Sequence, residues 1–132
     1  MTKNLGQVLW TDLTVPNAVE CRDFYHEVIG WSSEGVSMGD YEDFSMKATG
    51  PRPDPMGDGS VVAGVCHAKG DNGDMPAQWI IYVGVEDLDA SIAKAKQLGG
   101  KHVSKIRSYG KDRFSVIADP AGAVIGLYQQ AD

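Results

Sequence analysis

Hydrophobic and polar positions follow a pattern along the chain that occurs twice. Residues 10–30 predict a strand, a helix and a glycine stop, and residues 80–100 predict the same series at an offset of 70 (80 − 10). Within each predicted helix, apolar residues recur every three or four positions, so each helix has one face to bury. The two apolar stripes are Ala18, Cys21, Tyr25 and Val28 in the first helix and Leu88, Ile92, Ala95 and Leu98 in the second. A match at a fixed offset predicts two copies of one structural unit.

Polar residues and glycines mark the ends of both predicted helices. Asn17 and Asp87 stand at the N-cap, where a short side-chain oxygen accepts a hydrogen bond from a free backbone N–H, and Glu20 completes a capping box. Gly30 and Gly100 stand at the far ends, where glycine permits the left-handed conformation that stops a helix.

The match continues into the later strands but changes its offset. Residues 44–46 match 114–116 at an offset of 70, whereas residues 61–65 match 123–127 at 62, so the first copy is longer by eight residues (70 − 62). The extra length lies in 49–59, whose prolines and glycines predict a loop. The segment Gly50–Gly59 has the length and composition of a lid over a binding site, with a plain surface excursion as the alternative. Its counterpart, Asp119–Gly122, predicts a compact turn.

These elements predict an α+β fold made of a tandem βαβββ repeat within a single domain, residues 1–132. The first repeat covers about 6–69, a polar linker covers about 70–77, and the second repeat covers about 78–130. We expect two curved mixed sheets that form a cleft, with the helices on the outside.

Composition excludes several classes of protein. With 42% hydrophobic and 23% charged residues the chain is typical of globular domains. Its apolar runs are far shorter than the roughly 20 residues of a membrane span, and no secretory signal is visible, so we expect a cytoplasmic protein without a membrane partner. A net charge of −6 argues against a nucleic-acid partner. The two cysteines, Cys21 and Cys66, form no CxxC pair.

Two motifs, in order on this repeat, resemble those of a known family. The segment from Phe24-Tyr25 to Gly30-Trp31, followed near the end by Asp119-Pro120-Ala121-Gly122, is similar to the vicinal oxygen chelate superfamily of glyoxalases, bleomycin-resistance proteins and extradiol dioxygenases. The resemblance covers roughly residues 6–130. It implies the fold, a small-molecule ligand and a homodimer, but no single reaction, because the superfamily includes isomerases, dioxygenases, thiol transferases, epimerases and metal-free sequestering proteins.

The resemblance also locates four positions where metal-dependent members carry ligands, on the first and fourth strands of each repeat. They fall on Trp10, Gly64, Ile80 and Gly126, none of which can coordinate a divalent metal through its side chain. We therefore predict no metal and no cofactor. Glycine inside a strand often marks a close approach by another group, and we expect ligand atoms or Trp10 to fill the space beside the two glycines.

The predicted positions of the histidines and Cys66 do not bring them together as another metal site. His26 lies on a helix, Cys66 and His67 point to opposite faces of a strand, and His102 is expected at the surface.

Strand alternation then selects the side chains that line the expected cleft. They are Trp10, Asp12, Val62, Gly64, Cys66, Ile80, Tyr82, Val124, Gly126 and Tyr128. The set is mostly apolar and aromatic with a few polar groups, as in many small-molecule sites.

Asp12 and Tyr82 are the candidate catalytic residues. A carboxylate in an apolar cleft should have a raised pKa, which suits Asp12 to proton transfer or to pairing with a cationic ligand. The alternative is a structural aspartate that accepts hydrogen bonds from a loop or from Tyr82. The phenols of Tyr82 and Tyr128 either orient a ligand or form the wall of the site. Cys66, with no predicted cationic neighbour, is expected to be an unreactive small hydrophobe.

Three functions are compatible with these residues. The first is a metal-independent protein that binds an apolar or planar small molecule. The second is a glyoxalase- or dioxygenase-like enzyme, a lyase, isomerase or oxidoreductase, which uses Asp12 or Tyr82 for acid–base chemistry or an unrecognised divalent metal. The third is an assembly module, which leaves the aromatic cleft unexplained.

Overall fold

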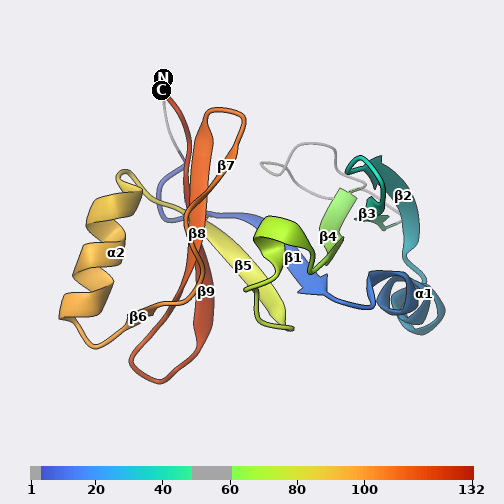
Figure 1. The fold of residues 1–132 in the computed structure, drawn as a ribbon, viewed down its shortest axis with the longest axis horizontal. Coiled ribbons are helices and arrows are strands. Elements are labelled where there is room, and N and C mark those ends of the chain that lie inside the picture. Colours follow the sequence, from blue (N-terminus) through green and yellow to red (C-terminus); the bar gives the residue numbers. More distant parts are fainter. Residues whose placement is uncertain (1–3, 49–60) are drawn as a thin grey trace. The chain divides into compact units, whose positions relative to one another are not determined.

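The computed structural model describes residues 4–48 and 61–132, and the Gly50–Gly59 loop lies outside them (Figure 1). The elements, in chain order, are β1 (Val8–Val15), α1 (Ala18–Ile29), β2 (Ser32–Ser37), β3 (Glu42–Lys47), β4 (Val61–His67), the 3₁₀ turn Gly70–Asn72, β5 (Trp79–Gly84), α2 (Leu88–Gln97), β6 (Lys101–His102), β7 (Arg107–Tyr109), β8 (Asp112–Ala118) and β9 (Val124–Gln129). None of the helices in these ranges is long and apolar enough to cross a membrane.

The chain divides into two compact units, which are described separately. Trp10–Trp79 form the first unit, and Ile80–Asp132 form the second unit together with the residues before Trp10. Backbone hydrogen bonds attach this N-terminal stretch to the end of β5: the N–H of Gly6 donates to Gly84 O over 2.8 Å, and the N–H of Gly84 donates to Gln7 O over 3.0 Å.

The strands follow one order, which corrects the expectation of two separate sheets. That order is β2-β3-β4-β1-β5-β9-β8-β6, with β7 beside β8. Strand β1 is divided between the two units, with Val8 and Leu9 in the second and Trp10–Val15 in the first.

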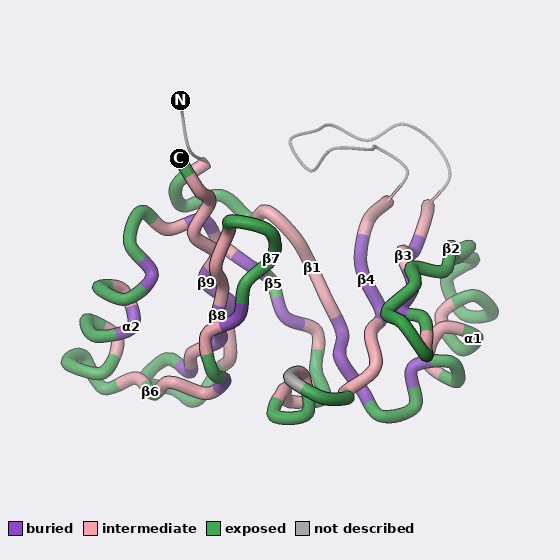
Figure 2. The backbone as a smooth tube through the Cα atoms, turned by 45° about the horizontal axis from the view of Figure 1, so that its top comes forward, coloured by how far each residue is buried: buried purple, intermediate pink, exposed green. Residues whose placement is uncertain are grey.

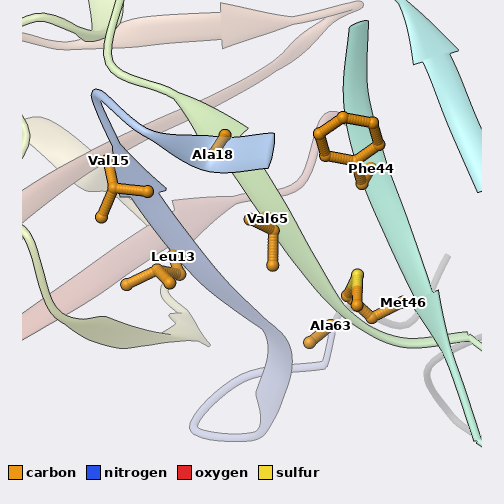
Figure 3. Close-up of a cluster of buried hydrophobic side chains, with 7 residues drawn as sticks. All are labelled: Leu13, Val15, Ala18, Phe44, Met46, Ala63 and Val65. Atoms are coloured by element: carbon orange, nitrogen blue, oxygen red, sulfur yellow. The ribbon is translucent and has the colours of Figure 1, made fainter. Parts of the chain in front are cut away.

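The first unit has the predicted βαβββ series. Strands β1 and β4 run parallel, whereas β3 pairs antiparallel with both β4 and β2. One face of these strands packs with the start of α1 to bury a hydrophobic cluster (Figure 3). Its members are Leu13, Val15, Ala18, Phe44, Met46, Ala63 and Val65. All of β2 is exposed (Figure 2).

The second unit has one more strand than predicted. Strands β5 and β9 run parallel and β9 pairs antiparallel with β8, but β8 then takes two short partners, β6 and β7, at its two ends. Residues 103–106 separate these partners because the N–H groups of Val103 and Ser104 both turn to Val116 O, over 2.9 and 3.2 Å. The helix-facing side buries Leu88, Ile92 and Leu127.

The two helix N-termini differ although both positions suit a cap. At α2 the prediction is confirmed, since Asp87 Oδ1 accepts a hydrogen bond from Ala90 N over 3.0 Å. At α1 the capping box is wrong: the Asn17 side chain caps no backbone N–H, and its Nδ2 donates to Glu20 Oε1 over 2.7 Å. The amide is thus used in a side-chain contact.

The predicted C-terminal stops are right for one helix and late for the other. Gly30 is left-handed, with φ of 91°, and its N–H donates to His26 O. In α2 the left-handed residue is Gly99, with φ of 95°, so Gly100 is not the stop. Helix α2 therefore ends earlier than predicted. The last residues of the two apolar stripes, Val28 in α1 and Leu98 after α2, are 63% and 68% exposed.

The turn at Asp119–Gly122 is as compact as predicted. Asp119 Oδ1 accepts hydrogen bonds from Ala121 N and Ala123 N, over 2.8 and 3.0 Å, and Gly122 is left-handed.

Phe44 and Phe114 are not equivalent, which corrects the predicted offset at the third strand. Phe44 pairs with Val65, whereas the residue that pairs with Leu127, the counterpart of Val65, is Ser115. The offset there is 71 (115 − 44) rather than 70. Because a slip of one residue reverses a strand's faces, Phe44 enters the helix-side core and Phe114 lies on the opposite face of its strand.

Candidate functional site

Four predicted site residues of the first unit meet on the face of the sheet opposite α1. Asp12 pairs directly with Gly64 in the parallel register of β1 and β4. The Trp10 Nε1–H donates to Asp12 Oδ1 over 3.3 Å, and the Cys66 thiol lies 3.6 Å from Asp12 Oδ1 and 3.5 Å from Oδ2. Alternation along two adjacent strands is enough to bring these side chains together.

The environment of Asp12 disfavours the ionised form of its carboxyl group. Burial raises the pKa of Asp12 to about 6; hydrogen bonds from Trp10 and Cys66 lower it, and the charge of Asp43 raises it. The prediction of a raised pKa is confirmed. The hydrogen-bond partners differ from those expected, since they are an indole N–H and a thiol rather than a loop or Tyr82.

Cys66 keeps its proton. Burial raises the pKa of the Cys66 thiol far above its ordinary value, and the charges of Asp12 and Asp43 raise it further. This agrees with the prediction of an unreactive cysteine, because the thiolate is the nucleophile. Its role as a hydrogen-bond donor to the Asp12 carboxylate was missed.

Asp43 is the functional candidate that sequence reasoning overlooked. This aspartate of β3 is only 6% exposed, and its Oδ1 accepts a hydrogen bond from His67 N over 2.8 Å. The same oxygen lies 3.4 Å from His67 Nδ1. The available signal was its position beside Phe44, because the neighbour of a core residue in a strand faces the other way.

The site residues of the second unit form an aromatic group. Ile80 and Tyr82 are 1% and 4% exposed. The Tyr82 ring meets Phe114 edge-on at 5.7 Å between centroids, and Phe114 stacks on Tyr128 at 6.0 Å with an interplanar angle of 11°. Phe114 is absent from the predicted set because the one-residue slip hides its orientation.

The phenol of Tyr128 is held by a carboxylate. Its hydroxyl donates to Asp112 Oδ2 over 2.7 Å, while Asp112 Oδ1 accepts from Ala131 N over 2.7 Å. Burial, followed by this hydrogen bond to Asp112, raises the pKa of Tyr128, so the phenol remains protonated.

Gly64 and Gly126 each lie against the side chain of the residue that pairs with them on the neighbouring strand. A Cβ at Gly64 would meet Asp12 Oδ1 first, with Trp10 Cζ2 at 3.4 Å, and a Cβ at Gly126 would meet the Tyr82 ring, with Cγ at 2.7 Å. The space is therefore filled chiefly by Asp12 and Tyr82, not by Trp10 or a ligand. Tyr82 pairs with Gly126 as Asp12 pairs with Gly64.

The four family ligand positions do not fit a divalent metal. Trp10, Gly64, Ile80 and Gly126 bring no carboxylate or imidazole, and the Trp10 nitrogen is a donor in a hydrogen bond. In the described ranges no three His, Cys, Asp or Glu side chains are grouped to hold a metal.

The remaining histidines have structural partners. His26, on the surface of α1, has its Nδ1 2.8 Å from Trp31 O. His102 is half-buried, with Nε2 2.7 Å from the fully buried Ser115 Oγ, which corrects its assignment to the surface.

The two valines of the predicted set lie at its margins. Val62 packs against the hydrophobic cluster of the first unit, beside the irregular register at Met46 and Lys47. Val124 pairs with Ala118 at the start of β9.

An open hollow of about 540 Å³ lies in the second unit beside α2, and none of the predicted site residues lines it.

The architecture, two βαβ-type units with a glycine in the last strand of each, defines a glyoxalase-like α+β fold. The Glyoxalase/Bleomycin resistance protein/Dioxygenase superfamily matches residues 7–127, and the chain belongs to it.

Curated relatives match with low identity. The anthracycline biosynthesis protein DnrV of Streptomyces peucetius is 29% identical over 95% of this chain and 47% of its own length. The CFP32 protein of Mycobacterium bovis is 27% identical over 99% of this chain and 47% of its own. The chain thus spans about half the length of these relatives.

Solved structures support the fold alone. A methylmalonyl-CoA epimerase variant of Streptomyces coelicolor, in complex with 2-nitronate-propionyl-CoA, has a TM-score of 0.52 and 15% identity, over 97% of this chain and 99% of that one. The Mn(II)-bound glyoxalase from Novosphingobium aromaticivorans has a TM-score of 0.54 and 16% identity, over 97% of this chain and 40% of that one.

Proposed function

We propose that the chain is a metal-independent small-molecule-binding protein of the glyoxalase/bleomycin-resistance type, which holds an apolar or planar ligand. The observation that carries this proposal is the aromatic group of the second unit. Tyr82, Phe114 and Tyr128 present one edge-on and one stacked contact on the face opposite α2. Phe114 and Tyr128 are only half-buried, which leaves ring surface for a planar molecule.

The chemistry of the ligand positions supports independence from metal. A divalent ion needs converging oxygen or imidazole donors, and the four positions that supply them in metal-dependent members lack them here. Asp12 and Tyr82 also occupy the space beside the two glycines. Binding therefore rests on stacking and apolar contact.

The test is a titration of the whole chain with a panel of planar aromatic compounds, including anthraquinones, naphthoquinones and flavones, in the presence of a chelator. Calorimetry and native mass spectrometry report binding. We expect at least one compound to bind, and Phe114→Leu to weaken it by roughly 2- to 12-fold, the value of one aromatic pair. Phe24→Leu is the matched control, because it is the same substitution at a ring that is 56% exposed on α1 of the first unit.

Two outcomes contradict the proposal. One is binding that disappears with the chelator and returns with a divalent metal. The other is equal weakening by Phe114→Leu and Phe24→Leu, which means that the aromatic group does not contact the ligand.

A second candidate, an enzyme that uses Asp12 for acid–base chemistry, is favoured by one observation. Asp12 has a pKa of about 6 and so changes protonation near neutral pH, as a general acid or base must. Each compound that binds is incubated with the protein, and products are followed by NMR. Conversion that is lost in Asp12→Asn but kept in Asp89→Asn, whose side chain is exposed, establishes this function. Binding without conversion supports the first.

We also propose that the chain forms a homodimer. Two copies have about the length of one DnrV chain, of which this chain covers 47%. Light scattering after size-exclusion chromatography measures the mass, and 14.2 kDa at every concentration contradicts the dimer.

A further inference from the structure

The open hollow of the second unit lies beside α2 and is lined by residues of α2, β8, β9 and the segment before the helix. Its volume of about 540 Å³ is within the range of small-molecule sites. Ala95, Ile117 and Leu127 belong to its mostly apolar lining. Leu88 and Ile92 hold α2 on the sheet at 0% and 6% exposure, so the hollow exists with the helix in place.

The tandem repeat shows what occupies the equivalent place in the first unit. The helix offset of 70 relates Ala95 to Tyr25 (95 − 25), and the strand pairing relates Leu127 to Val65. Tyr25 packs against the hydrophobic cluster that contains Val65, and Trp79 packs there too. In the first unit, therefore, aromatic rings cover this side of the helix.

Tyr25 and Trp79 contact each other as a pair. Their ring centroids are 5.3 Å apart at an interplanar angle of 73°, and the Trp79 Nε1–H donates to the Tyr25 hydroxyl over 2.8 Å. The second unit has Ala95 at the position of Tyr25, and Leu9 at the position of Trp79 (79 − 9 = 70). A methyl group and an aliphatic side chain thus replace a phenol and an indole, which accounts for the hollow.

We propose that the hollow beside α2 is a second binding site, which takes a neutral molecule of two fused aromatic rings, of the indole or naphthalene kind. The apolar lining suits the faces of such rings, and the first unit fills the same place with a phenol and an indole. This site goes beyond the proposed function, because Tyr82, Phe114 and Tyr128 do not line it.

The rim of the hollow accounts for the choice of a neutral ligand. Glu86 and Asp87 bring acidic side chains and Lys94 brings a basic one, so neither sign of charge is favoured in a ligand. Asp87 is also engaged, since its carboxylate caps α2 through Ala90 N. Affinity then comes from the apolar surface of the rings that leaves water.

The test uses the whole chain with indole as the probe, followed by ¹H–¹⁵N NMR. We expect saturable shifts of the backbone amides that line the hollow, with nuclear Overhauser contacts between indole protons and the Ala95 methyl group. Ala95→Tyr gives the second unit the residue that the first unit has at this position. Its ring takes the place of the probe, so indole should bind about 10-fold more weakly or less.

Ala93→Tyr is the matched control, because Ala93 is exposed on the same helix and does not line the hollow. Its affinity for indole should equal that of the wild type. Ser91→Leu narrows the hollow with a smaller side chain and should also weaken binding, so the test remains informative if Ala95→Tyr does not fold.

Equal affinity of Ala95→Tyr and Ala93→Tyr for indole overturns the proposal, as does the absence of shifts around the hollow. Signals of the hollow that respond to protein concentration instead of indole also overturn it, because a second copy of the chain then occupies the place. Phe114→Leu should leave the indole shifts at Ala95 unchanged, which separates this site from the aromatic group of the proposed function.

Discussion

The contact between Tyr82 and Gly126 predicts a large difference between two formally identical substitutions. In Gly126→Ala the new methyl group meets the Tyr82 ring, including Cγ at 2.7 Å, and Tyr82 is 4% exposed with Phe114 against its edge. The ring is attached at Cγ, so the whole side chain must move. Overpacking of this kind costs about 1–3 kcal/mol.

In Gly64→Ala the obstacle is the end of a side chain. The methyl group meets Asp12 Oδ1, while Asp12 Cγ and Trp10 Cζ2 stand at 3.4 Å. A carboxylate rotates at little cost, and alanine is better than glycine in a strand by roughly 0.5–1 kcal/mol. We therefore expect Gly64→Ala to change stability by less than about 1 kcal/mol.

The assay is urea and thermal unfolding of both variants, followed by circular dichroism. The expected loss in Gly126→Ala corresponds to a decrease in Tm of roughly 3–6 °C for each kcal/mol. A double-mutant cycle identifies the cause, because Tyr82→Ala removes the ring that the methyl group meets. In that background the cost of Gly126→Ala should be smaller by about 1 kcal/mol or more. Equal effects of the two glycine substitutions, or no coupling with Tyr82, would refute the reasoning.

Three further predictions concern single groups. Because the pKa of Asp12 rises from 3.8 to about 6 on folding, the native state binds a proton more tightly than the unfolded chain. The wild-type free energy of unfolding should therefore fall by roughly 2–3 kcal/mol as pH rises from about 4 to 6. Urea unfolding of Asp12→Asn should lack this decrease. A wild-type slope in Asp12→Asn would contradict it. Asp87→Ala should destabilise the protein by about 1 kcal/mol through loss of a helix cap, and Asn17→Ala by less because Asn17 caps no N–H; equal losses in thermal unfolding would show that the cap bond contributes nothing. Cys66 should react with a thiol reagent at pH 8 more slowly than Cys21 because its pKa is raised much further, and mass mapping that finds Cys66 modified first would reverse this assignment.

Local patterns predicted what local interactions determine. The repeat, the helix faces and the Asp119 turn follow from side-chain spacing and backbone chemistry within a few residues. Alternation along β1 and β4 also placed Asp12, Gly64 and Cys66 on one face, since these strands pair in register without a bulge. The raised pKa of Asp12 followed from that placement.

Features that depend on register between strands escaped prediction. The sequence match of Phe44 with Phe114 is good, yet the strands pair one residue apart, so one ring enters the core and the other lies on the opposite face of its strand. The role of Asp43 depends on the same β3–β4 register. The division of β6 from β7 depends on a local detour at residues 103–106, where two N–H groups share one carbonyl.

The covered glycines restrict how this scaffold can acquire a metal. A glutamate at residue 126 has its first side-chain carbon where the Tyr82 ring already lies, and one at residue 64 displaces the Asp12 carboxylate. Conversion of the second unit to metal chemistry in laboratory evolution thus requires paired replacements. Mutating the glycine first passes through an overcrowded protein, and mutating Tyr82 first passes through one with a cavity, so stepwise selection faces a barrier in both orders.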